Sequence, residues 1–540
     1  MCNYVVWLCF FISLFVNVIH CQSERWVYQY DGSGHDLDKA FAVVYGGDAN
    51  IYAAGYTWNT FEDFTVVSLT PGGNERWLYR YDGPGRDLDI GLSVAYGVDG
   101  NIYAAGISWG ALTSDDFLVV SLDADGNERW VYRYNGPANS VDGAYAVVYG
   151  EDGNIYVAGR GSGIGSFGDF TVISLTPQGD ERWVYTYNGS GSDDDCASSI
   201  VYGTDGHIYV AGVSYEGSSS DDFTIISITT SGDERWVYHY NGSDNYQDCA
   251  RAIVFGSDGN IYAAGKSYES GAYDDFTVVS IDTSGAERWV YTYNGPDNLY
   301  DDASSIAYGA DGHIYAAGGL GSGTWHNFCV ISITSSGTER WVYSYDGTAH
   351  LDDWAYSVAY GSDGNIYAIG DCWESGSMFD LTIISLNSSG GKRWVYNYDG
   401  PGNYNDEGSS IIYGLDGYVY AAGASYGGFD SDLDFAVLSL DPVLGIEECA
   451  TRLNPDDIFS IVSRYFRNSI TIRFVHSCPA PLRIRLFDIL GSTVYETILT
   501  STPSLVKLDD PSILKLSNGV YFLSISQGNK HYNTSKLLKF

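Results

Sequence analysis

A tryptophan recurs eight times along this 540-residue chain, and that repeat limits the possible folds more than any other feature. Each copy stands in a motif of the type ERWVYxY, and successive copies are 51 to 53 residues apart. The eight positions are Trp26, Trp77, Trp130, Trp183, Trp236, Trp289, Trp341 and Trp394. A period of this length predicts an array of similar supersecondary units.

Each unit contains four short apolar segments that are typical of β-strands. In the unit that begins at Trp236 they read WVYHY, ARAIVFG, GNIYAAG and DFTVVSI. The second and third segments are joined by SDGN, a strong hairpin signal because glycine tolerates positive φ. Four strands per unit and eight units predict an all-β fold, an eight-bladed β-propeller with one four-stranded sheet per blade. We expect the segment ending in YG to lie innermost and WVYxY to form the outer rim.

The two ends of the repeat array complement each other. The eighth unit contains SSIIYG, GYVYAAG and DFAVLSL, ends at Leu440, and lacks a WVYxY strand. The unused WVYQY strand at residues 26–30 would complete it, which joins the two ends and removes an open sheet edge. We therefore expect the propeller at residues 24–440, with an N-terminal strand closing the last blade.

The repeated pattern DGNIYxxG…DFxVxxL…G…W resembles that of secreted bacterial β-propeller repeat proteins. The resemblance covers the whole array and implies the fold. It does not imply a ligand, because propellers serve as binding modules, scaffolds and enzymes alike.

The N-terminal residues 1–22 contain an apolar run of about 15 residues, which is short for a membrane span. We interpret this segment as a signal peptide, so that no membrane span remains after its removal. The mature protein is then exported.

A different kind of sequence follows a linker at residues 441–448. Residues 449–540 contain strand-like segments and turns that predict a small β-sandwich. The segments LFDILGSTVYE, LSNGVYFLSIS and the lysine-containing last strand resemble the C-terminal sorting domain of type IX secretion substrates. The resemblance implies contact of residues 466–540 with the type IX secretion machinery, and a protein that is secreted or held at the outer cell surface. A generic immunoglobulin-like accessory domain is the alternative.

The net charge of −41 lies almost entirely on the repeat array. Residues 24–445 carry 16 Lys+Arg against 60 Asp+Glu, whereas residues 446–540 carry 11 against 8. A surface this acidic repels phosphate backbones, which argues against a nucleic-acid partner. It fits simple solubility, or attraction for divalent cations such as calcium and for cationic partners.

One aspartate stands seven positions before the last aromatic residue of each innermost strand. The eight are Asp38, Asp89, Asp142, Asp195, Asp248, Asp301, Asp353 and Asp406. Propeller symmetry predicts that they form a ring near the channel mouth. The ring could bind calcium, but a residue fixed in every unit more often solves a problem that each blade shares, such as capping a turn. A catalytic pair of carboxylates is the third alternative.

An aromatic column follows the glycine of the second strand in six units. Its members are Trp58, Trp109, Tyr215, Tyr268, Trp373 and Tyr426. A second acidic column lies nearby in sequence, from Asp63 to Asp434. Aromatic faces beside carboxylates suit sugar rings, so we predict a polysaccharide site here. The alternative is that these aromatics only cover the ends of the sheets.

Units six and seven depart from the repeat at Trp325, His326, Cys329 and Cys372. Their spacing matches no metal-binding motif, and we expect local packing.

These features predict a secreted, monomeric binding module or scaffold for polysaccharide or a surface protein. No cofactor is implied beyond calcium. The alternative is an extracellular glycan hydrolase or lyase that uses carboxylates at the propeller mouth. Such an enzyme needs two carboxylates made unequal by their neighbours, and the sequence reveals no such pair. No GxSxG, P-loop, HExxH or dinucleotide-binding motif stands in the strand-turn-helix context that its chemistry needs, which favours a role without catalysis.

Overall fold

The computed structural model describes residues 23–442 except positions 192, 218–219, 244, 270–272, 377, 403 and 429–431. Of the C-terminal region it describes 459–461, 465–466, 470–474, 482–488, 492–499, 505–508, 513, 515–517, 519–527 and 530–539. The chain divides into two compact units, with the boundary between residues 447 and 448. The predicted signal peptide and most of the predicted linker lie outside the described residues.

The first unit consists of eight four-stranded sheets, which we number as blades 1 to 8. Blade 1 contains β2 (Lys39–Tyr45), β3 (Ile51–Trp58), β4 (Glu62–Leu69) and β5 (Glu75–Tyr81). Blade 2 contains β6 (Asp89–Tyr96), β7 (Ile102–Trp109), β8 (Asp115–Leu122) and β9 (Glu128–Tyr134). Blade 3 contains β10 (Gly143–Tyr149), β11 (Ile155–Gly161), β12 (Asp169–Leu175) and β13 (Glu181–Tyr187). Blade 4 contains β14 (Cys196–Tyr202), β15 (His207–Tyr215), β16 (Asp221–Thr229) and β17 (Glu234–Tyr240).

The remaining blades repeat this order. Blade 5 contains β18 (Cys249–Phe255), β19 (Ile261–Tyr268), β20 (Asp274–Ile281) and β21 (Glu287–Tyr293). Blade 6 contains β22 (Asp301–Tyr308), β23 (His313–Ser322), β24 (Trp325–Thr334) and β25 (Glu339–Tyr345). Blade 7 contains β26 (Asp353–Tyr360), β27 (Asn365–Trp373), β28 (Phe379–Asn387) and β29 (Lys392–Tyr398). Blade 8 contains β30 (Asp406–Tyr413), β31 (Val419–Tyr426), β32 (Leu433–Asp441) and β1 (Ser23–Tyr30).

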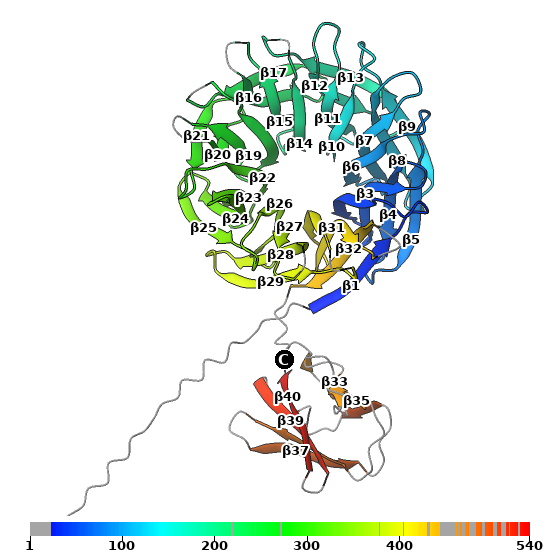
Figure 1. Cartoon of the computed structure of the whole chain (residues 1–540), viewed down its shortest axis with the longest axis vertical. Helices are drawn as coiled ribbons and strands as arrows, with labels where there is room; N and C mark the ends of the chain where they lie inside the picture. Colours follow the sequence, from blue (N-terminus) through cyan, green and yellow to red (C-terminus); the bar gives the residue numbers. More distant parts are fainter. Residues whose placement is uncertain are drawn as a thin grey trace, which may run out of the picture. The chain divides into compact units, whose positions relative to one another are not determined.

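The sheets are arranged around a central axis, with the first strand of each unit innermost (Figure 1). Strands that are neighbours in a sheet pair antiparallel, and each inner strand contacts the inner strand of the next blade, β30 and β2 included. The all-β, eight-bladed propeller predicted from the repeat is therefore confirmed.

Blade 8 combines the two ends of the array. Strand β1 pairs antiparallel with β32, and Val27 lies opposite Leu438 in the ladder. The sheet order β1-β32-β31-β30 confirms that an N-terminal strand closes the last blade. A backbone ladder across this seam replaces two open sheet edges with hydrogen bonds.

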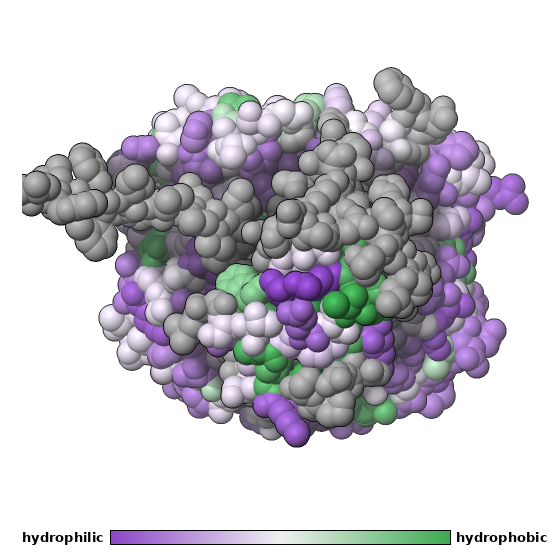
Figure 2. Space-filling model, turned by 90° about the horizontal axis from the view of Figure 1, so that it is seen from below, coloured by the Kyte–Doolittle hydropathy of each residue, from purple (hydrophilic) through white to green (hydrophobic). Residues whose placement is uncertain are grey.

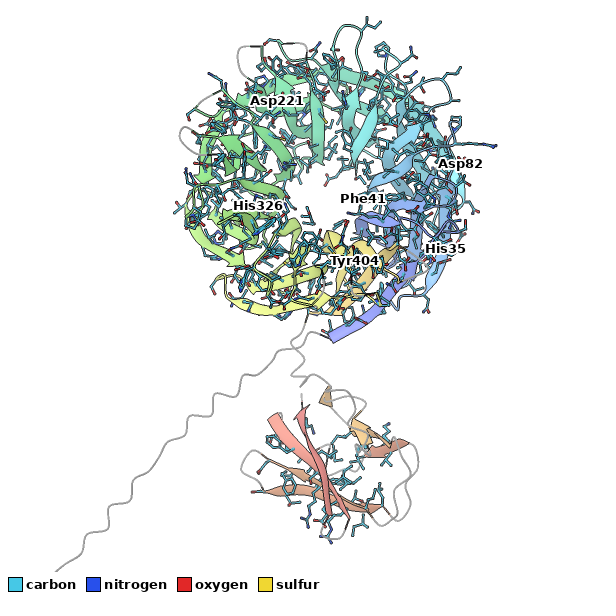
Figure 3. The ribbon with its side chains drawn as sticks, viewed as in Figure 1. His35, Phe41, Asp82, Asp221, His326 and Tyr404 are labelled. Carbon is cyan, nitrogen blue, oxygen red and sulfur yellow. The ribbon has the colours of Figure 1, made fainter. Side chains whose placement is uncertain are left out.

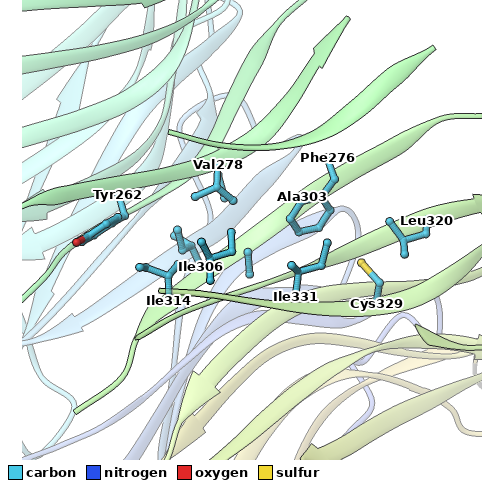
Figure 4. Close-up of a cluster of buried hydrophobic side chains, with 12 residues drawn as sticks. Tyr262, Phe276, Val278, Ala303, Ile306, Ile314, Leu320, Cys329 and Ile331 are labelled. Carbon is cyan, nitrogen blue, oxygen red and sulfur yellow. The ribbon is translucent and has the colours of Figure 1, made fainter. Parts of the chain in front are cut away.

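Hydrophobic side chains fill the space between neighbouring sheets. The core between blades 5 and 6 is typical: Tyr262 and Phe276 of blade 5 pack against Ile306 and Ile331 of blade 6 (Figure 4). Cys329 is fully buried in the same cluster. Alternating strand residues point to the two faces of each sheet, so each blade contributes to two such cores.

The ERWVY motif owes its repetition to contacts with the next blade. In blade 3, Nη1 of Arg182 donates to the Tyr156 hydroxyl at 3.2 Å and its Nη2 donates to the Thr230 carbonyl of blade 4 at 3.0 Å. The indole of Trp183 donates to the same carbonyl, and the Tyr185 hydroxyl donates to Glu234 of blade 4. Each motif therefore fastens one blade rim to the next, which explains why its arginine and tryptophan recur in all eight copies.

The C-terminal unit forms two sheets over one core. One sheet contains β33 (Phe459–Ile461), β35 (Ile470–Phe474) and β38 (Leu505–Leu508). The other contains β34 (Tyr465–Phe466), β40 (Lys530–Lys539), β39 (Gly519–Gln527), β36 (Leu482–Phe487) and β37 (Thr493–Leu499). Ile472 and Val506 of the first sheet pack with Ile484 and Leu523 of the second, which confirms the small β-sandwich.

Within the described residues, no helix has the length and apolar character that a membrane crossing requires. The side of the molecule visible in Figure 2 is mostly hydrophilic or intermediate, with hydrophobic side chains in small groups.

Candidate functional site

The eight ring aspartates are fully buried. In blade 4, Asp195 Oδ2 accepts the Gly189 N–H at 2.8 Å and Oδ1 accepts the Tyr215 N–H at 2.6 Å. Seven blades show this pair of bonds; in blade 2, Asp89 accepts the Gly83 N–H, while the Trp109 N–H donates to the Leu88 carbonyl. The carboxylate thus ties the loop that enters each blade to the end of its second strand, which fits a turn-capping role.

Burial raises the pKa of these carboxyl groups. The pKa values rise to about 7 for Asp38 and Asp248 and to about 6 for five other members, and the pKa of Asp301 is also raised. The cause is desolvation of the charged form, which the backbone N–H groups offset only in part.

Two of the ring aspartates, Asp38 and Asp406, each lie close to two other acids. Two groups of three carboxylates have oxygen atoms within 4.8 Å: Asp31 with Asp38 and Asp434, and Asp380 with Asp399 and Asp406. Each group combines one ring aspartate with two acids of the preceding blade. A hard cation such as calcium takes oxygen ligands of this kind, so these blade junctions are where the calcium prediction can be tested.

Four members of the aromatic column lie close against the loop that enters their blade. A Cβ on loop residue Gly34 would lie 2.3 Å from Trp58 Cδ1, and one on Gly191 would lie 2.0 Å from Tyr215 Cδ1. Trp109 and Tyr426 contact Gly85 and Gly402 in the same way. These rings therefore lie against the loop backbone, and the missing Cβ makes room for them.

The residues that break the repeat gather at three positions of each blade, which we call the axial positions. The first lies on the inner strand: Lys39, Ile90, Gly143, Cys196, Cys249, Asp302, Trp354 and Glu407. The second is its cross-strand partner on the second strand: Tyr56, Ile107, Arg160, Val213, Lys266, Gly319, Asp371 and Ala424. The third is the bulged inner-strand residue: Phe41, Leu92, Tyr145, Ser198, Arg251, Ser304, Tyr356 and Ser409.

Variation at the axial positions contrasts with the constant residues around them. The first position has seven residue types in eight blades, the second has eight and the third has five, whereas the ring aspartate and the motif Arg and Trp never change. A position that serves only the blade fold is under the same demand in all eight copies. The axial positions are therefore where the propeller loses its rotational symmetry, as a single asymmetric ligand would require.

Among the described residues, four ion pairs involve the axial positions. They are Lys39–Glu407, Arg160–Asp194 at 2.7 Å, Arg251–Asp302 at 2.6 Å and Lys266–Asp274 at 2.6 Å. Of the 16 basic residues in the array, nine belong to the ERW-type motifs, and four of the other seven are in these pairs. A strongly acidic protein thus places most of its remaining cations where the blades differ.

A pocket of about 410 Å³ opens where blade 8 meets blade 1, and we call it the seam pocket. Its lining includes the aromatic residues Phe41, Tyr56, Tyr404 and Tyr426 and the polar residues Lys39, Asn405, Glu407 and Asp432. The Tyr404 and Tyr426 rings lie 5.1 Å apart, and the Phe41 and Tyr56 rings 5.9 Å apart. Phe41 and Tyr404 are labelled at this seam in Figure 3.

An unequal pair of carboxylates lies beside the seam pocket. Asp371 is almost completely buried, its Oδ1 accepts the Gly408 N–H at 2.7 Å, and burial raises its pKa to about 8. Glu407, its neighbour in the next blade, forms an ion pair with Lys39. The sequence did not reveal this pair, because no other blade carries an acid at the position of Asp371.

Four exposed tyrosines lie outside the predicted column. Tyr246, Tyr273, Tyr300 and Tyr404 are 57%, 43%, 51% and 48% exposed, and all four lie in loops between strands. Their signal in the sequence is variation at these loop positions, which carry polar residues in some blades and apolar residues such as Leu37 and Leu299 in others. Two members of the predicted column contact this exposed set. Tyr426 lies beside Tyr404, and Tyr268 lies beside Tyr246.

The cysteines and histidine of blades 6 and 7 form no shared site. Cys329 and Cys372 lie in two different hydrophobic clusters, and His326 pairs with Asp352 at 2.8 Å. Cys196 and Cys249 are free thiols. Cys449 and Cys478 lie outside the described residues.

Comparison with known proteins identifies the C-terminal unit. Residues 466–539 match the family model of the secretion system C-terminal sorting domain, which indicates export and a place at the cell surface or in the medium. No curated protein sequence matches the chain.

Two solved structures show a distant similarity to the chain. Sqt1 of Chaetomium thermophilum is similar over 78% of this chain and 98% of that protein, with a TM-score of 0.49 and 10% identity. PorZ, a surface component of the type-IX secretion system of Porphyromonas gingivalis, is similar over 94% of this chain and 74% of that one, with a TM-score of 0.41 and 11% identity.

Proposed function

We propose that this exported propeller is a carbohydrate-binding module that holds an uncharged polysaccharide in the seam pocket. The observation that supports this most is the composition of the pocket, which combines four aromatic rings with fixed hydrogen-bonding groups. Sugars present C–H faces that stack on aromatic rings and hydroxyl groups that need donors and acceptors, so both kinds of group are matched.

Two charged groups of the pocket are held in place before any ligand binds. Lys39 and Glu407 pair with each other, and the Lys39 ammonium lies 5.2 Å from the centre of the Phe41 ring. A preorganised pair donates and accepts hydrogen bonds with little further loss of side-chain freedom. Its charges cancel, which suits an uncharged sugar.

The proposal is tested by retention of the purified mature protein on insoluble neutral polysaccharides, followed by calorimetric titration with hexasaccharides of those retained. Tyr404→Ala should weaken binding in the seam pocket at least tenfold, because it removes an exposed stacking face. Phe167→Ala is the control, since Phe167 is 68% exposed in a loop of blade 3. If no glycan binds, or if Tyr404→Ala binds as the original protein does, the proposal fails.

The unequal carboxylates favour glycan hydrolysis as a second candidate function. A carboxyl group that keeps its proton near neutral pH can protonate a glycosidic oxygen, and an ionised partner can act as base or nucleophile. Asp371 would be the acid and Glu407 the partner. Reducing ends released from a retained polysaccharide, and abolished by Glu407→Gln, would support catalysis; binding without release would exclude it.

A further inference from the structure

The junction of blades 5 and 6 repeats the chemistry of the seam pocket. Tyr246 and Tyr268 occupy the blade 5 positions that Tyr404 and Tyr426 occupy in blade 8, and their rings lie 4.4 Å apart. By the propeller symmetry, blade 6 stands to blade 5 as blade 1 stands to blade 8. No other blade carries a tyrosine at both positions.

A second aromatic pair adjoins the first. The Tyr273 and Tyr300 rings lie 4.6 Å apart and come from the loop before β20 and the loop before β22. Both side chains are about half exposed, so each presents a face to solvent. Four tyrosines in two pairs thus line this junction. The seam pocket likewise has four aromatic residues.

Charged side chains at this junction form a neutral quartet. Arg251 binds Asp302 of blade 6 through Nε at 3.0 Å and Nη2 at 2.6 Å, and Lys266 binds Asp274 at 2.6 Å. Asp274 follows Tyr273 directly, and Asp302 lies two residues after Tyr300. The Arg251–Asp302 pair joins blade 5 to blade 6, just as Lys39–Glu407 joins blade 1 to blade 8. In the first pair the earlier blade supplies the cation, whereas at the seam blade 8 supplies the anion and blade 1 the cation.

We propose that the tyrosines and the charge-paired quartet at the blade 5–blade 6 junction form a second binding site for an uncharged glycan. The site rests on the same chemistry as the proposed function of the seam pocket. The Arg251 side chain is 45% exposed, so its guanidinium keeps donors for sugar hydroxyls while Asp302 fixes its position.

The quartet also selects against charged glycans. Two cations and two carboxylates cancel, so neither an anionic nor a cationic sugar gains a net attraction. A polyanionic glycan must in addition approach a protein of net charge −41. Two neutral sites on one disk let a single polymer bind both, which raises its retention above that of a short oligosaccharide.

Calorimetric titration of the full mature chain with the neutral hexasaccharide found for the seam pocket tests this proposal. We expect two binding events for the original protein. The double variant Tyr273→Ala/Tyr300→Ala should leave one event, Tyr404→Ala should leave the other, and the triple variant should bind at least a hundredfold more weakly. Phe167→Ala should keep both, and an unchanged melting temperature should accompany each variant.

A second variant guards against loss of folding. Arg251→Gln/Asp302→Asn keeps polar side chains of similar shape without charges, and it should weaken only the second event, at least tenfold. One event in the original protein, abolished by Tyr404→Ala, would overturn the second site and leave the proposed function standing. No event with any glycan would overturn both. The second site would also be overturned if the second event survives Tyr273→Ala/Tyr300→Ala, or if a uronate hexasaccharide binds there as well as the neutral one.

Discussion

The rim and the axial positions of the same blades follow opposite rules. At the rim, the same Arg, Trp and Tyr make the same contacts with the next blade in copy after copy, as Arg129 and Arg182 do with the carbonyls of Pro177 and Thr230. At the axial positions, the second strand alone carries a different residue in each of the eight blades. Both regions belong to the same sheets, so the difference cannot come from the fold.

This contrast separates the residues that hold the fold together from the residues that vary between blades without changing the fold. The rim must hold eight junctions together and uses one solution for all of them. The axial positions include paired charges, aromatic rings and part of a pocket, and their residues differ from blade to blade. We therefore expect substitutions at the rim to change stability and substitutions at the axial positions to change binding.

The largest effect should come from removal of the closing strand. A mature chain that lacks residues 23–30 loses the β1–β32 ladder and the contacts of Arg25 and Trp26 with the Pro71 carbonyl. We expect loss of the cooperative thermal transition, or a melting temperature lower by more than about 10 °C, because one sheet edge opens and two blades lose their junction. Circular dichroism and size-exclusion chromatography measure this. An unchanged transition would show that the ring does not depend on its seam.

The second effect concerns pH. The ring aspartates have pKa values raised to about 6 or 7, above those of an unfolded chain, so they bind protons more tightly in the folded state. Their contribution to stability is complete below about pH 4 and is lost as the pH rises through 6 to 7. Hairpin aspartates such as Asp48 have lowered pKa values and act in the opposite direction at low pH. We expect the highest melting temperature near pH 5 and a fall of several degrees by pH 8.

A matched pair of variants distinguishes the effect of the buried ring aspartates on the melting temperature from the effect of the protein's net negative charge. Asp195→Asn removes a buried ring carboxylate, and Asp180→Asn removes an exposed one. Only Asp195→Asn should reduce the difference in melting temperature between pH 5 and pH 8. A rise at pH 8 on addition of millimolar calcium would show that the carboxylate groups at the blade junctions bind a cation. A melting temperature that increases from pH 5 to pH 8 would contradict the burial argument.

The third prediction compares two arginines of blade 3. Arg182→Met removes rim hydrogen bonds to Tyr156, Ser174 and the Thr230 carbonyl and should cost about 2–4 kcal/mol. Arg160→Met removes an axial ion pair with the half-exposed Asp194 and should cost less than about 1 kcal/mol. Urea denaturation measures both. Equal losses would break the distinction between rim and axis.

The sequence predicts the fold far better than the site, for a physical reason. The repeat period, the hairpin turns and the missing eighth rim strand are properties of the chain, and they determine blade number and closure. Which side chains share a face depends on register, and a bulge in each inner strand shifts it by one residue, as between Ala40 and Ala42. The openness of Trp58 depends in turn on Gly34, a residue in a distant loop.

The smallest effect tests the rim rule at a junction where one of its bonds is missing. In seven junctions a rim tyrosine donates to a glutamate of the next blade, as Tyr291 does to Glu339 at 2.7 Å. Blade 7 carries Lys392 instead, so Tyr343 of blade 6 lacks that acceptor. Lys392→Glu should restore the bond and raise stability by about 0.5 kcal/mol, or about 1 °C in melting temperature, because the site is exposed.

The gain in stability from Lys392→Glu should require the hydroxyl group of Tyr343. In 150 mM salt, which screens the added negative charge, Lys392→Glu in a Tyr343→Phe background should give no increment. Differential scanning calorimetry of the four proteins measures the coupling. If the two substitutions are additive, the rim glutamates act through charge alone, and the repeated motif holds the blades by its arginine and tryptophan without help from this bond.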